Sequence, residues 1–443
     1  MDKKRIIVFG LKITGISSAK ALSHLGYDVL VYADKKDDDF YRALDELKDY
    51  GVKSLESIND LDFSQFSYLL KSPGIRLDNP LVKLARKNNL QVVSDVELAY
   101  RLFEDVKFIA ITGTNGKTTT THMVSSILTA ANVKNMVVGN IGIGLLWQIV
   151  ENGLDTVYVL EVSSFQLASS ESFRSKIACL TNISPDHIDW HGSYEEYTKC
   201  KLQITANQKL TDTIIVNADD HSAGLVEAIT KARIRRISST KKLLEGSYCI
   251  DDYFYIDNEK SVISKSDINL VGRHNLENTL FATEVALALG ISQEDIRKGI
   301  QALKPIEHRI EKVKTLDGVS YFNDSKGTNV DSTIKALDGF DNPIILIAGG
   351  YDKKADYTDL FKGRTNIKNV ILFGQTKYDI KKVASSYGLQ VDLCKDLEEA
   401  VRLSKKYGQK NDVVLFSPAC ASWDMYKNFE ERGEHFKKIV NDL

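Results

Sequence analysis

Cysteine is scarce in this 443-residue sequence. Its five copies, at positions 179, 200, 249, 394 and 420, form no C-x-x-C pair. They therefore offer neither a disulfide framework nor a metal cage, and they fit reduced thiols in a cytoplasmic protein. No segment approaches the roughly 18 consecutive apolar residues of a transmembrane helix. The apolar run at residues 6–9 is short and lacks a following A-x-A cleavage site, so it predicts a first strand, not a signal peptide.

An excess of charge of either sign is also missing. The 58 basic residues are balanced by 60 acidic ones, so no surface field for nucleic acid or a membrane is expected. A hydrophobic content of 43% and a charged content of 27% are typical of a soluble globular protein. The length predicts about three domains. We place them at residues 1–95, 96–304 and 305–443, and we expect a monomer.

The most informative segment is VKFIAITGTNGKTTTTHMV, at residues 106–124. Its apolar run FIAI predicts a buried strand, the stretch from Gly113 to Gly116 predicts a tight turn, and Lys117 begins a helix. Backbone N–H groups in such a turn can surround a phosphate, and a lysine at the helix start can reach the outer phosphates of a nucleotide. This segment therefore indicates nucleotide binding.

The match to a P-loop is incomplete. The pattern G-x-x-x-x-G-K-[ST] lacks its first glycine, because Ile111 stands there. Thr118 or Thr119 could offer a hydroxyl to Mg²⁺, and Glu161, which ends a later apolar strand, could hold the same ion as a Walker-B carboxylate does. The alternatives are an ordinary glycine-rich turn and a solvated strand end.

Alternating strands and helices predict an α/β fold with mostly parallel sheets. The N-terminal region is predicted to be Rossmann-like, with strands at 5–10, 28–32 and 68–71 and a helix at 16–25. Gly10 and Gly15 do not keep the G-x-G-x-x-G spacing, so dinucleotide binding is poorly supported. The third strand runs into Ser72-Pro-Gly-Ile75, a glycine turn at the strand end where open sheets bind ligands.

The rest of the chain continues this alternation. A central P-loop ATPase-type sheet is predicted from strands at 136–138, 158–162, 177–181 and 214–216, with short antiparallel strands near 240–266 and helices at 274–289 and 293–302. Pro305 then marks a hinge. A C-terminal Rossmann-like domain is predicted from strands at 319–322, 343–348, 370–373 and 413–416. A Gly-, Ser- or Thr-rich turn follows each of these strands, and such turns would line one edge of a sheet.

Two further stretches carry candidate metal ligands. His187 and His191 lie four residues apart, but no third ligand accompanies them, so one histidine beside Mg²⁺ is preferred to a zinc site. The helix predicted at 194–207 places Lys201 on its inward stripe. This lysine is either a functional group with a depressed pKa or one whose stem packs while its charged head reaches water.

Ten motifs occur in the order found in the Mur ligases. They are GTNGKTT, GNIG, EVSSFQL, NISPDHID, the lysine of KLQI, GRHNLEN, HRIE, NDSKGTN, GGYDKK and SPACASWDMYKNFEERGEHF. Because they span all three predicted domains, the whole chain resembles this family. The SPACAS block and the short N-terminal region most resemble the family members that add D-glutamate.

The resemblance implies an ATP-dependent amide ligase of cytoplasmic peptidoglycan precursor synthesis. Its substrates would be ATP, D-glutamate and UDP-N-acetylmuramoyl-L-alanine, and it would use two Mg²⁺ ions. The alanine carboxylate would first take the γ-phosphoryl group, and the amine of D-glutamate would then attack the acyl phosphate. The two outer domains would close on the central one.

The resemblance also assigns residues to each ligand. ATP would contact Gly113, Thr114, Asn115, Gly116, Lys117, Thr118, Thr119, Asn275, Asn278, Arg309 and Asp324. One Mg²⁺ would bind Thr118 and Glu161, and the second would bind His187 and a carbamylated Lys201. The UDP-linked substrate would contact Ile13, Thr14, Asp34, Lys35, Ser72, Pro73, Gly74 and Asn140. D-glutamate would contact Thr328, Lys353, Ser422 and Phe429.

Two of these assignments carry departures from the family pattern. Lys35 and Lys36 replace a Thr-Arg pair of some relatives, which puts individual uracil contacts in doubt. Either Lys353 or Lys354 could meet D-glutamate, and the spacing to the ADY sequence favours Lys353.

Two rival functions stay open at the level of sequence. A P-loop kinase or NTP-driven regulator would explain the Gly113 turn and Glu161, but not the four C-terminal turns. A dinucleotide-dependent oxidoreductase would require NAD binding in the N-terminal region, where the glycine spacing is broken.

Overall fold

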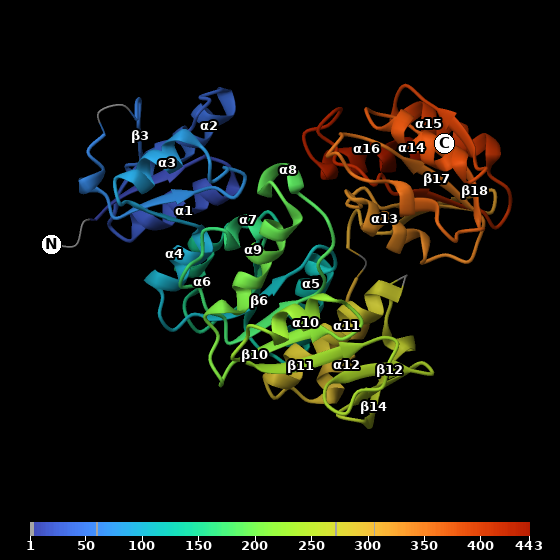
Figure 1. The fold of residues 1–443 in the computed structure, drawn as a ribbon, viewed down its shortest axis with the longest axis horizontal. Coiled ribbons are helices and arrows are strands. Elements are labelled where there is room, and N and C mark those ends of the chain that lie inside the picture. The colour runs from blue at the N-terminus through green and yellow to red at the C-terminus, as the bar shows by residue number, and fades with distance from the viewer. Residues whose placement is uncertain (1–3, 59–60, 271–272, 305) are drawn as a thin grey trace. The chain divides into compact units, whose positions relative to one another are not determined.

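The computed structural model describes residues 4–58, 61–270, 273–304 and 306–443. Three sheets follow one another along the chain, each with its own helices (Figure 1). The chain forms two compact units. The first contains Met1–Ile183, Glu195–Asp267 and Asn278–Ala302, and the second contains Ser184–Tyr194, Ile268–Glu277 and Leu303–Leu443. The predicted three-domain α/β class is confirmed. The boundaries at 95 and 304 stay predictions, and the expected hinge at Pro305 lies outside the described residues.

The first sheet has five parallel strands in the order β3-β2-β1-β4-β5. They are β1 (Arg5–Phe9), β2 (Asp28–Tyr32), β3 (Lys53–Ser54), β4 (Tyr68–Lys71) and β5 (Gln91–Val93), and the accompanying helices are α1 (Ile13–His24), α2 (Asp38–Glu46) and α3 (Pro80–Lys87). Helix α1 begins three residues before its predicted start, because the Ile16 N–H already donates to the Lys12 carbonyl. The turn predicted over GLKITG is therefore shorter than expected.

The second sheet has nine strands in the order β14-β13-β12-β11-β10-β9-β6-β8-β7. They are β6 (Lys107–Thr112), β7 (Asn135–Gly139), β8 (Val157–Glu161), β9 (Ile177–Leu180), β10 (Thr213–Asn217), β11 (Arg233–Ser238), β12 (Ser247–Ile250), β13 (Tyr253–Ile256) and β14 (Glu259–Ser264). Pairing is parallel from β7 through β12 and antiparallel from β12 through β14, as predicted. Strand β6, which leads into the phosphate-type turn, lies between β8 and β9.

Nine helices are described between the first and third sheets. They are α4 (Asp95–Leu102), α5 (Lys117–Ala130), α6 (Leu145–Asn152), α7 (Ser164–Leu167), α8 (Ile188–His191), α9 (Tyr194–Ala206), α10 (Ser222–Glu227), α11 (Arg273–Ala288) and α12 (Gln293–Ala302). Helix α5 begins at Lys117, as predicted. Helix α8 starts after His187, whose φ of 53° is left-handed, so His187 and His191 do not share a regular helix.

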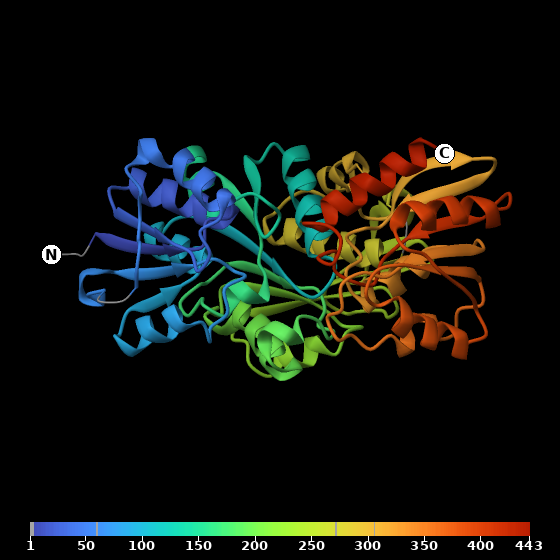
Figure 2. The ribbon, with the colours of Figure 1, turned by 90° about the horizontal axis from the view of Figure 1, so that it is seen from above.

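The third sheet has the order β15-β16-β20-β17-β18-β19. Its strands are β15 (Glu311–Leu316), β16 (Val319–Asn323), β17 (Ile344–Ala348), β18 (Ile367–Leu372), β19 (Gln390–Leu393) and β20 (Val413–Phe416), and its helices are α13 (Val330–Leu337), α14 (Lys377–Ser386), α15 (Leu397–Tyr407) and α16 (Phe429–Asn441). The core divides over the two faces of the sheet: α13 and α14 pack on one face, and α15 and α16 pack on the other (Figure 2). The four predicted strands are the four adjacent parallel strands β16, β20, β17 and β18, so their terminal turns share one edge.

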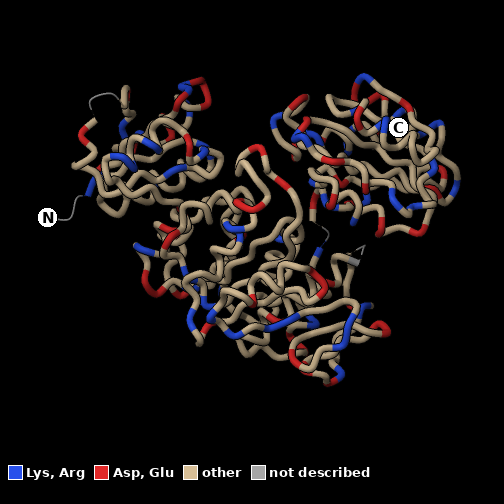
Figure 3. Tube along the Cα trace, viewed as in Figure 1, with Lys and Arg blue, Asp and Glu red and all other residues tan. Residues whose placement is uncertain are grey.

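Basic and acidic residues are interspersed along the described trace (Figure 3). Among the described helices, none is both long enough and apolar enough to cross a bilayer.

Candidate functional site

The turn between β6 and α5 is built so that only glycine fits at two positions. Gly113 and Gly116 have φ values of 148° and 86°. A Cβ at Gly113 would collide with the Thr181 hydroxyl, and one at Gly116 would lie 2.5 Å from Asn278 Oδ1. The turn is also fixed by the segment after β9, because the Thr114 N–H donates to the Asn182 carbonyl at 2.9 Å. The result is a rigid glycine turn at a helix N-terminus, which is a favourable site for phosphate.

Lys117 lies at the first position of α5 and folds back over this turn. Its ammonium donates to the carbonyl oxygens of Gly113 at 2.9 Å and Thr114 at 2.8 Å. The ammonium is therefore held at the mouth of the turn, where a bound phosphate would meet it.

A buried carboxylate faces the start of α5. Glu161 ends β8, is 2% exposed and accepts a 2.7 Å hydrogen bond from the Thr118 hydroxyl. Asn140 Nδ2 donates to the other carboxylate oxygen at 3.1 Å. Carboxylate and hydroxyl oxygens are the ligands that Mg²⁺ prefers, so Thr118 and Glu161 fit such an ion. The predicted pair is brought together by the parallel neighbours β6 and β8.

Lys201 points inward from α9, as its helical phase predicts. It is 2% exposed, its ammonium donates to the Gly113 carbonyl at 2.6 Å, and it lies 4.8 Å from the ring centroid of Tyr197. The Tyr197 hydroxyl in turn hydrogen-bonds the Thr114 hydroxyl at 2.9 Å. The alternative in which the head of Lys201 reaches water is therefore wrong, and α9 is tied directly to the phosphate-type turn.

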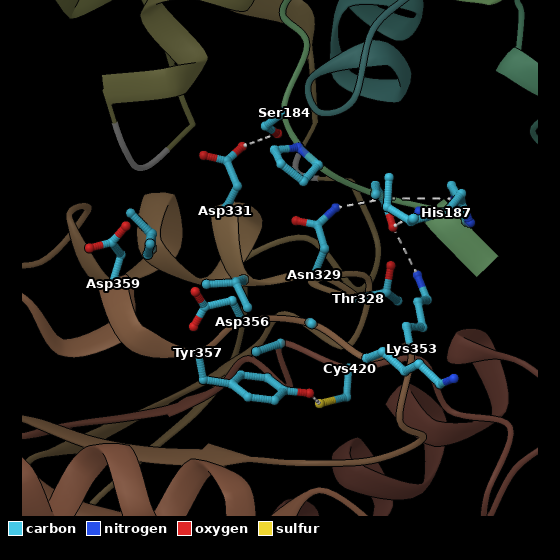
Figure 4. A pocket seen from close by; sticks show the side chains of 18 of the residues that line it. Ser184, His187, Thr328, Asn329, Asp331, Lys353, Asp356, Tyr357, Asp359 and Cys420 are labelled. Atoms are coloured by element: carbon cyan, nitrogen blue, oxygen red, sulfur yellow. Dashed lines mark hydrogen bonds and ion pairs between the residues drawn. The ribbon is translucent and has the colours of Figure 1, made fainter. Parts of the chain in front are cut away.

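The second unit contains a cavity of about 500 Å³ (Figure 4). Thr328 and Lys353 line it, together with Asp186 and Asn329. The Asp186 carboxylate accepts hydrogen bonds from Lys353 Nζ at 3.3 Å and Asn329 Nδ2 at 3.1 Å, and His187 Nε2 lies 3.6 Å away. Burial opposes ionisation of Asp186, yet the charges of Lys353 and His187 and the bond from Asn329 hold its pKa well below its usual range. The cavity therefore presents a lysine already paired with a carboxylate.

Ser422 and Phe429 lie outside the lining of this cavity. Ser422 is 2% exposed, and its carbonyl accepts hydrogen bonds from the N–H groups of Met425 and Tyr426. The Phe429 ring packs edge-on against His308, 6.2 Å between centroids. Of the four residues predicted to bind D-glutamate, Thr328 and Lys353 are thus brought together.

The remaining residues predicted to bind ATP lie on α11 and at the start of the third sheet. Asn275 and Asn278 are buried one turn apart on α11, and Asn278 Oδ1 accepts a hydrogen bond from the Thr120 hydroxyl at 3.2 Å. Asp324 follows β16 and accepts from the Ser417 hydroxyl at 2.7 Å. Burial raises the pKa of Asp324 to about 6, with Arg309 opposing the rise.

The residues predicted to bind the uridine nucleotide gather at the carboxyl ends of β1, β2 and β4. Ile13 and Thr14 form the first turn of α1, and the Ser72 hydroxyl donates to the Gly10 carbonyl at 3.0 Å. Asp34 accepts from Asn79 Nδ2 at 2.8 Å. Pro73 and Gly74 continue the turn after Ser72, and Lys35 is exposed. Because β2, β1 and β4 are adjacent, these turns share one edge of the first sheet.

Sequence reasoning missed two polar residues of the cavity. Asp186 and Asn329 stand beside His187 and Thr328 in the motifs NISPDHID and NDSKGTN, so the motifs could have drawn attention to them. The two residues lie 143 positions apart in the sequence, so no local sequence pattern indicates that they form a hydrogen bond.

Family models match nearly the whole chain. They are the MurD-like N-terminal domain of Mur ligases over residues 4–94, the Mur ligase middle domain over 111–286 and the Mur ligase glutamate ligase domain over 308–420. Two curated relatives are the UDP-N-acetylmuramoylalanine--D-glutamate ligases of Caldanaerobacter subterraneus subsp. tengcongensis and Clostridioides difficile. The first is 42% identical over 100% of this chain and 99% of its own, and the second is 39% identical over 99% of both.

Solved structures at lower identity share the fold. MurF from Acinetobacter baumannii is 18% identical, with a TM-score of 0.65 over 100% of this chain and 93% of its own. The UDP-N-acetylmuramate-alanine ligase MurC from Thermotoga maritima is 19% identical, with a TM-score of 0.62 over 99% of both chains. The rigid glycine turn, the Thr118–Glu161 pair and the full-length similarity lead to one conclusion: the chain belongs to the Mur ligase family.

Proposed function

We propose that this chain is a cytoplasmic ligase that uses ATP to join D-glutamate to UDP-N-acetylmuramoyl-L-alanine. The observation that carries the proposal is the 42% identity, over the full length, to a relative named for that activity. The product is a peptidoglycan precursor, and ADP and phosphate are released. An unactivated carboxylate does not acylate an amine at neutral pH, so phosphorylation of the alanine carboxylate precedes attack by D-glutamate.

The glycine turn and its neighbours support the nucleotide assignment. The backbone from Gly113 to Thr118 surrounds the phosphates, and Lys117 supplies a positive charge at its mouth. Thr118 and Glu161 would hold one Mg²⁺, and such an ion would offset charge on the transferring phosphoryl oxygens. A second Mg²⁺ on His187 and a carbamylated Lys201 is part of the proposal. Asn275, Asn278, Arg309 and Asp324 are proposed to contact the nucleotide.

The cavity of the second unit supports an acidic amino acid as the other substrate. Lys353 offers an ammonium and Thr328 a hydroxyl, which suit a carboxylate, and Asp186 holds the ammonium in place. We assign the side-chain carboxylate of D-glutamate to this pair. Ser422 and Phe429 are retained as proposed contacts on the family resemblance.

The uridine half is assigned to the turns at the edge of the first sheet, with Asn140 on the muramoyl group. Lys35 is exposed, and its contact with the uridine half of the substrate is part of the proposal.

The test is an assay of phosphate release and product mass with ATP, Mg²⁺, UDP-N-acetylmuramoyl-L-alanine and a panel of D- and L-amino acids. We expect phosphate release only when the UDP-linked acceptor and D-glutamate are both present. ATP hydrolysis without either substrate would favour an NTP-driven regulator and contradict the proposal.

A further inference from the structure

Gly144 sits in a contact that leaves no room for a Cβ unless Ser17 moves. It precedes α6, and α6 packs on α1. A Cβ at Gly144 would lie 2.5 Å from the Ser17 hydroxyl oxygen, closer still to Ser17 Cβ, and 3.1 Å from the Ile13 carbonyl oxygen. The Gly144 backbone itself is ordinary, with φ −72° and ψ 130°. Glycine is thus required here by the space between two helices and not by backbone conformation.

Polar and aromatic contacts hold the same two helices together. The backbone N–H of Trp147 donates to the Ser17 hydroxyl at 3.1 Å. Lys20 Nζ lies 3.8 Å from the Trp147 ring centroid, a distance at which the cation and the ring attract each other. The ring of Tyr50 meets that of Trp147 edge-on at 5.8 Å. We call Ser17, Lys20, Gly144 and Trp147 the α1–α6 junction.

The junction lies between two proposed parts of the substrate site. On one side, Ile13 and Thr14 form the first turn of α1. On the other side, the loop that ends at Gly144 begins with a Gly139 N–H to Ile143 carbonyl hydrogen bond at 3.0 Å. Asn140 of that loop is held by Glu161 twice, through its backbone N–H at 3.0 Å and its side chain at 3.1 Å. A continuous series of contacts therefore links the α1 turn to the Glu161 carboxylate.

We propose that Gly144 and Ser17 are positioning residues, whose close contact sets the separation between the uridine-binding turn at Ile13 and the muramoyl-binding loop at Asn140. The inference rests on the proposed function, because it assumes that one UDP-linked substrate spans both elements. Such a substrate presents its alanine carboxylate near Glu161 only when the two elements have the correct spacing. A misplacement of about 1 Å at a reacting group can lower the rate by about a hundredfold.

The first test is Gly144→Ala, which adds a methyl group to the junction and leaves the backbone unstrained. We expect kcat/KM for UDP-N-acetylmuramoyl-L-alanine to fall at least about tenfold, while the KM values for ATP and D-glutamate stay within about twofold. A purely structural role would instead lower the unfolding temperature and leave the three KM values in their original ratio. Gly224→Ala is the matched control, because a Cβ there meets nothing within 4 Å.

The second test is rescue. Ser17→Gly removes the atoms with which the new methyl group collides, so the Ser17→Gly, Gly144→Ala double variant should regain most of the lost kcat/KM. Calorimetric binding of the UDP-linked substrate should follow the same pattern. An unchanged kcat/KM in Gly144→Ala, or a folded double variant with no recovery, would overturn the inference. If Gly144→Ala does not fold, Ser17→Gly alone decides: a fall in kcat/KM for the UDP-linked substrate with unchanged KM values for ATP and D-glutamate supports the inference, and unchanged kinetics overturn it. Wild-type protein without ligase activity would refute the proposed function itself, and the inference with it.

Discussion

At the scale of single residues, three lysines assigned to the reaction have polar partners, and Lys117 and Lys201 share the Gly113 carbonyl. Lys117 donates to two turn carbonyls, Lys353 is paired with the Asp186 carboxylate, and Lys201 donates to the Gly113 carbonyl beside the Tyr197 ring. A buried ammonium is costly, and an ammonium repels Mg²⁺, which demands oxygen ligands. Reaction of a neutral Lys201 amine with CO₂ would convert it into an oxygen-donating carbamate at the same place.

Lys201→Ala should therefore lose most activity, and acetate or formate should restore part of it by filling the vacated anionic position. Turnover measured with and without added carboxylate checks this. Lys199→Ala is the control on the same helix, since the Lys199 side chain is 78% exposed. A mild loss without rescue would contradict the carbamate.

Asp324 makes the stability of the second unit depend on pH. Burial raises its pKa to about 6 in the folded protein, above its ordinary value of 3.8. The folded state therefore binds the proton more tightly than the unfolded state, and stability falls as pH rises from about 4 to about 6. A shift of this size corresponds to roughly 3 kcal/mol.

Urea unfolding at pH 4.5 and at about pH 7 measures how much unfolding free energy is lost between the two. We expect this loss to be smaller in Asp324→Asn than in the wild type. An equal loss in both would contradict the assignment, and Asp341→Asn, at an exposed position, is the control.

At the scale of elements, strand β6, the Gly113 turn and helix α5 offer a positive charge because their geometry fixes Lys117, and not because many basic side chains gather there. The turn is fixed by Thr181, Asn182 and Asn278, so Lys117 is held at its mouth before any ligand arrives. An electrostatic contact of this kind is typically worth about 3 kcal/mol in a transition state.

Lys117→Ala should therefore reduce kcat by at least about a hundredfold, because charge gathers on the transferring phosphoryl group. Steady-state phosphate release measures the effect, and circular dichroism establishes that the variant is folded. Near-normal turnover in folded protein would refute the nucleotide assignment.

The elements differ in how far sequence alone could find them. Strand β17, with the sequence IILIA, is apolar throughout because both faces of its sheet are covered, and it was predicted. Strand β11 also lies between two parallel neighbours, but its sequence RIRRIS has no apolar run, and it was not predicted. Strands β15 and β19 were not predicted, because EKVKTL and QVDL are half-buried edge strands without an apolar run. Helical phase correctly placed Lys201 inside. The partner of Lys353 was missed, because Asp186 lies 167 positions away and no local pattern encodes that contact.

At the scale of the whole molecule, the proposed substrates are divided between units. The glycine turn and the uridine edge belong to the first unit, and the cavity with Lys353 belongs to the second. Amino-acid selection should therefore be separable from nucleotide binding.

Lys353→Ala should raise the KM for D-glutamate far more than the KM for ATP, because it removes the cation proposed to meet the substrate carboxylate. Lys382→Ala is the control, since its side chain is exposed and lies outside the lining of the cavity, and it should leave both constants nearly unchanged. Equal effects of Lys353→Ala on both KM values would place this lysine elsewhere, and a larger effect of Lys354→Ala would transfer the role to that residue.

The division into units is not a division of the chain into consecutive pieces. The backbone passes between them five times, after residues 183, 194, 267, 277 and 302. Asp186 and His187 therefore belong with Lys353, although two segments of the first unit, Glu195–Asp267 and Asn278–Ala302, are inserted between them in the sequence. An expression fragment of residues 303–443 would carry Lys353 but leave behind the carboxylate that neutralises it. The amino-acid cavity can be dissected by point substitution, whereas cutting the gene at any codon between those of Asp186 and Lys353 would separate the two partners.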